Sequence, residues 1–69
     1  MKNNDIINAK LIGLTTFIHL NFRIEFEGKE YVCKLKEPSD FYKLRDYVMK
    51  PITLRIVDIT RNPMVVELC

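Results

Sequence analysis

The chain has 69 residues, with 11 Lys and Arg against 9 Asp and Glu, so its formal net charge is +2. This length predicts a single small domain, residues 1–69, and leaves little room for the pocket and scaffold of an enzyme. The charge is too weak to indicate nucleic-acid binding by itself. Because 48% of the residues are hydrophobic and only two are Gly, the composition is that of a globular protein and excludes a disordered chain.

Neither the N-terminal segment nor the longest uncharged stretch predicts export or membrane insertion. The segment Met1–Asp5 is not followed by a long apolar run or a small-residue cleavage site. The longest uncharged stretch, residues 11–22, is too short and too polar to span a bilayer. We therefore expect a cytoplasmic protein without membrane contact. In that compartment Cys33 and Cys69, which lack CxxC spacing, are expected to be reduced thiols.

The first element, residues 5–17, has two interpretations. Ile7, Ala9 and Leu11 alternate with polar residues, and the parity changes near Gly13, which is typical of a strand bent at a bulge. The β-branched isoleucines of this segment also favour a strand. A short helix, capped by Asn or Asp at its start and ended by the glycine, is the alternative.

A β-hairpin is predicted over residues 20–37. Its first half alternates apolar and polar residues, with the apolar set Leu20, Phe22, Ile24 and Phe26. Gly28–Lys29 is then a two-residue loop of type II′, because glycine occupies its first position. Folding about this loop pairs Phe22 with Leu35 and Ile24 with Cys33, and it directs the large apolar side chains to one face.

A helix is predicted over residues 39–50. Ser39 is a favourable N-cap, and Pro51 should end the helix because the residue before a proline avoids the α region. The expected buried stripe consists of Phe41, Leu44 and Val48.

Two more strands follow the helix. Apolar residues alternate from Ile52 to Ile56, and the parity then switches to Val57 and Ile59, which indicates a β-bulge. A turn is predicted at residues 61–63, before a last strand at 64–68. The register between these two strands cannot be derived from the pattern.

The order of the predicted elements is therefore β-β-β-α-β-β. We predict a mainly β (α+β) protein, a compact five-stranded antiparallel barrel or curled sheet with one helix. This order resembles that of the OB-fold over the whole chain, although the resemblance rests on topology and on no sequence motif. An SH3-like barrel and a plain sheet under one helix remain alternatives.

No group of residues has the spacing of a catalytic or metal site. His19 is the only histidine and has no ligands at metal-binding spacing around it. The inward direction predicted for Cys33 makes its thiol unreactive. Three glutamates, at positions 25, 27 and 30, lie at a convex hairpin tip rather than in a cleft. We expect neither an enzyme nor a bound cofactor or metal.

Basic residues gather on the outer face of the second and third strands. The predicted register places Arg23 opposite Lys34, and Asn21 opposite Lys36. The resemblance to the OB-fold implies that this face could bind single-stranded nucleic acid. Against this function, the aromatic residues of both strands are predicted to point to the core, whereas single-strand binding needs exposed aromatics for stacking.

The exposed side of the helix is the preferred site. Tyr42 and Met49 are typical interface residues, and with Lys43 and Asp46 they form the predicted protein-binding surface. We therefore expect a small binding module that acts on a protein partner, as an adaptor or inhibitor, a type of protein common among phage and mobile-element accessory proteins. Nucleic-acid binding is the alternative function, and a homodimer through the 64–68 strand is a third.

Overall fold

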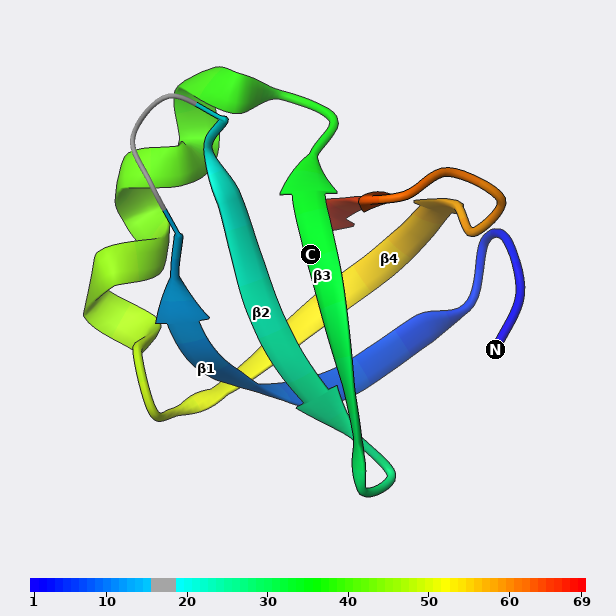
Figure 1. Ribbon diagram of the computed structural model, residues 1–69, viewed down its shortest axis with the longest axis horizontal. Coiled ribbons are helices and arrows are strands. Elements are labelled where there is room, and N and C mark those ends of the chain that lie inside the picture. Colours follow the sequence, from blue (N-terminus) through cyan, green and yellow to red (C-terminus); the bar gives the residue numbers. More distant parts are fainter. Residues whose placement is uncertain (16–18) are drawn as a thin grey trace.

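Five strands close into a barrel in this computed structural model, which describes residues 1–15 and 19–69 (Figure 1). The elements are β1 (Ile6–Leu14), β2 (Asn21–Phe26), β3 (Lys29–Leu35), the helix η1 (Pro38–Tyr47), β4 (Pro51–Asp58) and β5 (Met64–Leu68). The barrel order is β1-β2-β3-β5-β4, and β4 pairs with β1 to close it. The predicted mainly β fold, with five strands and one helix between the third and the fourth, is confirmed.

One pair of strands departs from the predicted antiparallel arrangement. β3 and β5 run parallel, with Cys33 opposite Met64 and Leu35 opposite Val66, whereas the other four pairs are antiparallel. The parallel pair follows from the connection, because η1 and β4 together return the chain so that β5 enters beside β3 in the same direction. The order of strands and helix is OB-like.

The first segment is a strand, and the helical alternative for it is wrong. β1 pairs with β2 and β4 at the same time, and its register against β2 shifts between Leu11 and Gly13. This irregularity is the bulge that the change of parity predicted. Positions 16 and 17 of the predicted strand lie outside the described residues.

The hairpin has the predicted faces but a different register. Phe22 lies opposite Cys33 and Ile24 opposite Tyr31, so the predicted pairing is wrong by two positions. The two loop residues are Glu27 and Gly28, with φ of 52° and 79°. Positive φ at both positions is the type I′ turn, which matches the strand twist. Because side chains alternate with period two, a shift of two positions leaves every side chain on its predicted face.

The helix η1 is a 3₁₀ helix that ends before the predicted boundary at residue 50. It begins after Glu37, which makes no side-chain capping hydrogen bond, so the prediction of Ser39 as N-cap is wrong. At its end the backbone becomes extended at Val48, and Met49 N–H donates to Leu11 O at 2.7 Å. Strand pairing with β1 therefore ends η1 before Pro51 is reached.

The bulge predicted near Val57 is confirmed. Ile56 pairs with Val66, but Asp58 pairs with Val65, so one extra residue lies between them on β4. β5 itself pairs with β3 on one side and β4 on the other. It is therefore not an edge strand, and the predicted homodimer through 64–68 has no free edge to use.

The core fills the barrel and continues under η1. Leu44 of η1 is completely buried and closes one end of the barrel. The other buried core residues come from all five strands: Ile7, Ala9, Leu11, Phe22, Ile24, Cys33, Leu35, Ile52, Leu54, Ile56, Met64 and Val66. Alternate strand residues supply nearly all of this core, so the outer face of each strand and one side of η1 remain for contacts with other molecules.

Candidate functional site

Exposed apolar side chains concentrate around η1. Eight large hydrophobic residues of the described part of the chain are exposed, and five of them lie on η1, directly after it, or at the neighbouring end of β1: Leu14, Tyr42, Tyr47, Val48 and Met49. Clustering of this kind is typical of interaction surfaces, whereas single exposed apolar residues are ordinary.

A groove, which we call the η1–β4 groove, lies between η1 and the start of β4. Its volume is about 480 Å³. Leu68 and Cys69 form one wall of the groove. Cys69 N–H donates to Thr53 O at 3.2 Å, and this hydrogen bond holds that wall against β4. The lining residues are Tyr42, Lys43, Asp46, Tyr47, Pro51, Ile52, Thr53, Leu68 and Cys69.

Tyr42 forms a ridge between two hollows. It lines the η1–β4 groove on one side and, on the other, a hollow of about 360 Å³ that also contacts Leu14, Phe41 and Arg45. Its side chain is 64% exposed. Tyr42 is therefore available to a partner that enters either hollow, and tyrosine is among the residues that contribute most to binding energy at interfaces.

The structure brings three of the four predicted protein-binding residues together. Tyr42, Lys43 and Asp46 all line the η1–β4 groove. Met49 is 60% exposed but lies beyond the end of η1, outside the groove lining. The sequence analysis did not single out Tyr47, which is exposed and lines the same groove. It also missed the residues of β4 and β5 that line the groove, because only barrel closure brings these two strands close to η1.

The charged residues of the groove are available to a partner. Lys43 Nζ lies 3.2 Å from Asp40 Oδ1, and both side chains are partly exposed. A surface pair of this kind contributes about 0–1 kcal/mol, so Lys43 can exchange partners at little cost. Asp46 forms no ion pair within residues 1–15 and 19–69.

The predicted facing pairs on the outer face of β2 and β3 are wrong. Arg23 lies opposite Val32, and Lys34 lies opposite Asn21. Lys36 follows the end of β3 and is exposed, so it has no partner position in β2. The predicted basic residues therefore share a face without the predicted Arg23–Lys34 and Asn21–Lys36 contacts.

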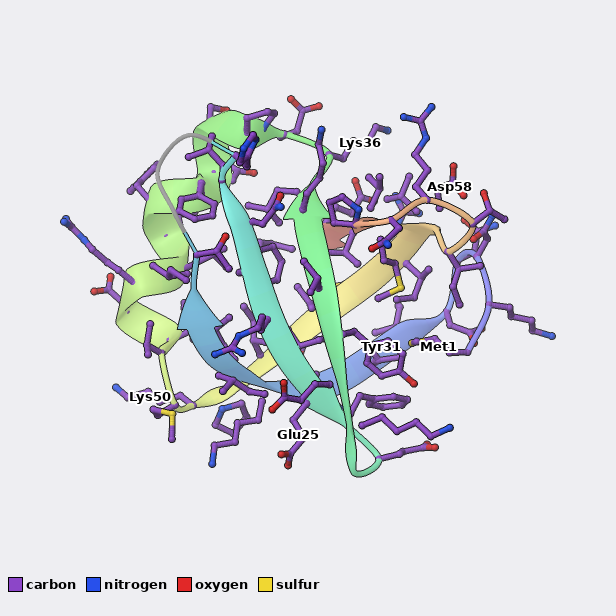
Figure 2. The ribbon with its side chains drawn as sticks, in the orientation of Figure 1. Met1, Glu25, Tyr31, Lys36, Lys50 and Asp58 are labelled. Carbon is purple, nitrogen blue, oxygen red and sulfur yellow. The ribbon has the colours of Figure 1, made fainter. Side chains whose placement is uncertain are left out.

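Acidic residues lie beside the basic residues on the outer face of β2 and β3. Arg23 Nη1 lies 3.9 Å from Glu30 Oε2, and Glu25 is directly opposite Glu30. Figure 2 shows Glu25 near the hairpin tip and Lys36 at the other end of β3, so the charges separate along the strand.

The aromatic side chains of the hairpin point away from this face. Phe22 is buried, and Phe26 and Tyr31 pack against the core. Within β2 and β3 the outer face therefore offers no aromatic ring for base stacking.

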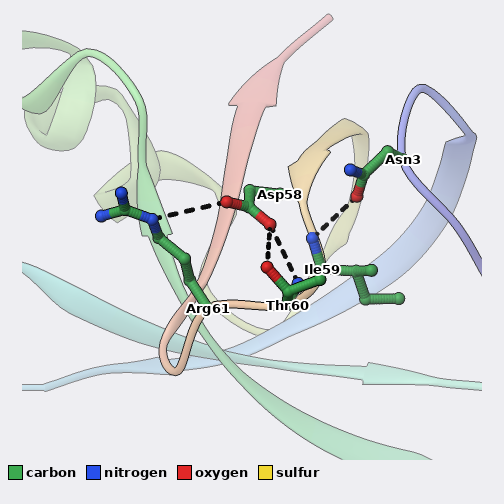
Figure 3. A network of polar contacts seen from close by, with 5 residues as sticks. All are labelled: Asn3, Asp58, Ile59, Thr60 and Arg61. Atoms are coloured by element: carbon green, nitrogen blue, oxygen red, sulfur yellow. Dashed lines mark hydrogen bonds and ion pairs between the residues drawn. The ribbon is translucent and has the colours of Figure 1, made fainter.

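A polar network orders the loop between β4 and β5 (Figure 3). Asp58 Oδ1 accepts hydrogen bonds from the Thr60 hydroxyl at 2.6 Å and the Thr60 N–H at 3.0 Å, and Asp58 Oδ2 lies 3.4 Å from Arg61 Nε. These donors, the Thr60 hydroxyl first, lower the pKa of Asp58. Asn3 Oδ1 accepts from Ile59 N–H at 2.8 Å. The network thus has a structural role, fixing the loop and the first residues of the chain.

Residues 1–15 and 19–69 form neither a metal-binding cluster nor a membrane-spanning helix. No three His, Cys, Asp or Glu side chains there lie close enough to hold a metal ion. His19 is exposed, whereas Cys33 is buried with its pKa raised to about 12 by desolvation. No helix in these ranges has the length and apolar character needed to cross a membrane.

Comparison with known proteins gives no relative from which a function could be transferred. No family model matches the chain, and neither a curated protein nor a solved structure matches it. Function must therefore be inferred from the surfaces described above.

Proposed function

We propose that this protein is a small, non-enzymatic binding module of the cytoplasm that acts by occupying a protein partner, as an adaptor or inhibitor. The observation that carries this proposal is the exposed apolar cluster around η1, of which Tyr42 and Tyr47 also line the η1–β4 groove. A rigid barrel is a suitable support, because an ordered surface loses little conformational entropy when it binds.

The parts of the surface have different roles in such an interaction. Tyr42 supplies the central contact, because it is exposed and flanked by two hollows that a partner can fill. Lys43 and Asp46 carry opposite charges on the groove and so orient the partner rather than supply most of the affinity. Met49 extends the apolar contact past the end of η1, where a flexible thioether adapts to the partner's shape.

The proposal is tested by capture from the native host. Tagged wild type is compared with the Tyr42→Ala/Met49→Ala variant, and bound proteins are identified and then retested as purified pairs. Ile6→Ala is the matched control, because Ile6 is an equally exposed apolar residue on β1. The partner should be lost from the double variant and kept by the control. Equal recovery by all three proteins would contradict a role for η1.

Nucleic-acid binding through the outer face of β2 and β3 is a second candidate, favoured by the OB-like order of the barrel. It would use Asn21, Arg23, Lys34 and Lys36. Affinity for single-stranded DNA or RNA should then fall steeply with salt, and Arg23→Glu/Lys34→Glu should abolish it. Lys50→Glu, the same charge change between η1 and β4 and outside the four proposed residues, is the control. No binding of either nucleic acid at low salt excludes this function.

A further inference from the structure

We propose that, when no other protein is bound, the η1 surface is occupied by a second copy of this chain, in a two-fold symmetric dimer with the two η1 helices antiparallel. The inference rests on the proposed function of the η1–β4 groove and names its occupant. It replaces the dimer through residues 64–68, because the closed barrel leaves β5 without a free edge.

The order of residues along η1 is self-complementary. The four residues of η1 that line the groove are Tyr42, Lys43, Asp46 and Tyr47. They are placed symmetrically about the midpoint between Leu44 and Arg45, with tyrosines outside and opposite charges inside. An interface across a two-fold axis requires that if one residue contacts another, the reverse contact also forms. An axis at this midpoint pairs Tyr42 with Tyr47, and Lys43 with Asp46, twice each.

Charge decides the orientation of the two helices. In the antiparallel arrangement every charge of the groove side meets its opposite. A parallel arrangement would place Lys43 beside Lys43 and Asp46 beside Asp46 of the other copy, and like charges in contact at an interface are strongly unfavourable. The pattern therefore selects the antiparallel dimer.

The single chain leaves these groups available for the second copy. Asp46 forms no ion pair within the described ranges, and Lys43 holds only the exposed pair with Asp40. Arg45 lines the hollow that contacts Leu14 and not the η1–β4 groove, so it lies outside the charge pairing.

Aromatic contacts supply the apolar part of the interface. Tyr42 and Tyr47 are 64% and 46% exposed in the single chain, and the groove beside them provides room for side chains of the other copy. Tyrosine is enriched at protein interfaces, because its ring buries apolar area while its hydroxyl stays hydrated or hydrogen-bonded. The tyrosines provide affinity, and the Lys43–Asp46 pairs provide register.

The test is a charge exchange followed by analytical ultracentrifugation. All proteins carry Cys69→Ser, because the exposed Cys69 thiol could otherwise link chains by a disulfide. The parent protein should sediment as a dimer. Lys43→Glu alone and Asp46→Lys alone should each weaken dimerisation by about tenfold or more, because each places like charges together twice.

A mixture of the two single variants provides the decisive result. When one chain carries Lys43→Glu and the other Asp46→Lys, the introduced glutamate faces the introduced lysine, and the native Asp46 faces the native Lys43. An equimolar mixture should therefore recover the dimer. Lys29→Glu, the same charge change at the first residue of β3, should leave dimerisation unchanged. Circular dichroism checks that each variant is folded.

Each contrary outcome has a definite meaning. A monomeric parent protein, variants that remain dimeric, or a mixture that stays monomeric would each overturn the dimer. If the parent is monomeric but a different protein is captured in a Tyr42-dependent way, the proposed function survives and only its occupant is wrong. If the dimer forms with the expected charge dependence but η1 binds no other protein, the adaptor or inhibitor role fails and the dimer stands.

Discussion

Phe22 lies directly opposite Cys33 in the β2–β3 ladder, and both side chains are completely buried in the barrel. Burial raises the pKa of the Cys33 thiol to about 12, so the reactive thiolate is almost absent at neutral pH. Cys69 is exposed. We predict that a thiol reagent such as Ellman's reagent modifies one cysteine per chain rapidly in the native protein and both after unfolding.

The Cys69→Ser variant separates the two thiols. It should show no rapid reaction until denaturant is added, and Cys33→Ala should keep the rapid reaction of the parent if it folds. Rapid modification of both cysteines in folded wild type would mean that the barrel opens more readily than its packing indicates.

The β2–β3 turn contains a residue poorly suited to its conformation. Glu27 has φ of 52° at the first position of a type I′ turn, where Asn is strongly preferred. Glu27→Asn should raise the free energy of unfolding by about 0.5–1 kcal/mol, because asparagine adopts positive φ more readily. Urea titration measures the change. Glu27→Gln also removes the charge from the acidic hairpin tip but has no such preference, so a gain of equal size there would assign the effect to charge.

The same turn explains why sequence could predict the faces of the hairpin but not its pairing. Gly28 can serve as either position of a two-residue turn, and the two choices differ by two positions of register. The alternation of inward and outward side chains is the same in both registers, so Phe22 and Cys33 point inward in either one. The predicted contact between Arg23 and Lys34 depended on the register of the two strands. Because the predicted register was wrong, this contact was wrong as well.

Irregularities within strands were predictable, whereas the end of η1 was not. The bulges near Gly13 and Val57 change the parity of apolar residues, which is visible in the sequence. The boundary of η1 depends on hydrogen bonding between Met49 and Leu11, which barrel closure produces and local propensity does not encode. Tyr42 could be selected from the sequence as an exposed helix residue. The wall of the η1–β4 groove on β4 could not be predicted, because only barrel closure brings it to η1.

Two positions of η1, Leu44 and Tyr42, should differ sharply in their effect on stability. Leu44 is completely buried against the barrel, so Leu44→Ala should cost about 2–5 kcal/mol. Tyr42 is mostly exposed, and Tyr42→Ala should change stability by about 0.5 kcal/mol or less. Thermal and urea unfolding compare the two variants. A large loss from Tyr42→Ala would show that this side chain supports the fold, and would remove it from the binding surface.

The polar network at Asp58 predicts a contribution to stability that depends on pH. The Thr60 hydroxyl and N–H hold the pKa of Asp58 below its ordinary value in the folded protein. Ionised Asp58 therefore stabilises the fold at pH values above its unfolded pKa, and this contribution is lost as pH falls through the folded pKa. Asp58→Ala should be less stable than wild type at neutral pH, and the difference should shrink in acid.

Thr60→Val tests the cause of this pKa shift, because it removes the hydroxyl that lowers the pKa most while leaving the backbone N–H. An NMR titration of the Asp58 carboxyl should show a higher pKa in this variant. An unchanged pKa would assign the shift to the remaining donors, the Thr60 N–H and Arg61.

Met49 offers a way to separate stability from binding. Its φ is 66°, a conformation that costs a non-glycine residue about 1 kcal/mol and costs glycine little. Met49→Gly and Met49→Ala both remove the exposed thioether side chain, but only the first relieves the backbone. Met49→Gly should therefore be as stable as Met49→Ala or more stable by up to about 1 kcal/mol in urea unfolding, and the two should bind a partner of the η1 surface equally weakly. If Met49→Ala instead binds like wild type while remaining folded, the thioether makes no contact with the partner, and the binding surface ends at Tyr47.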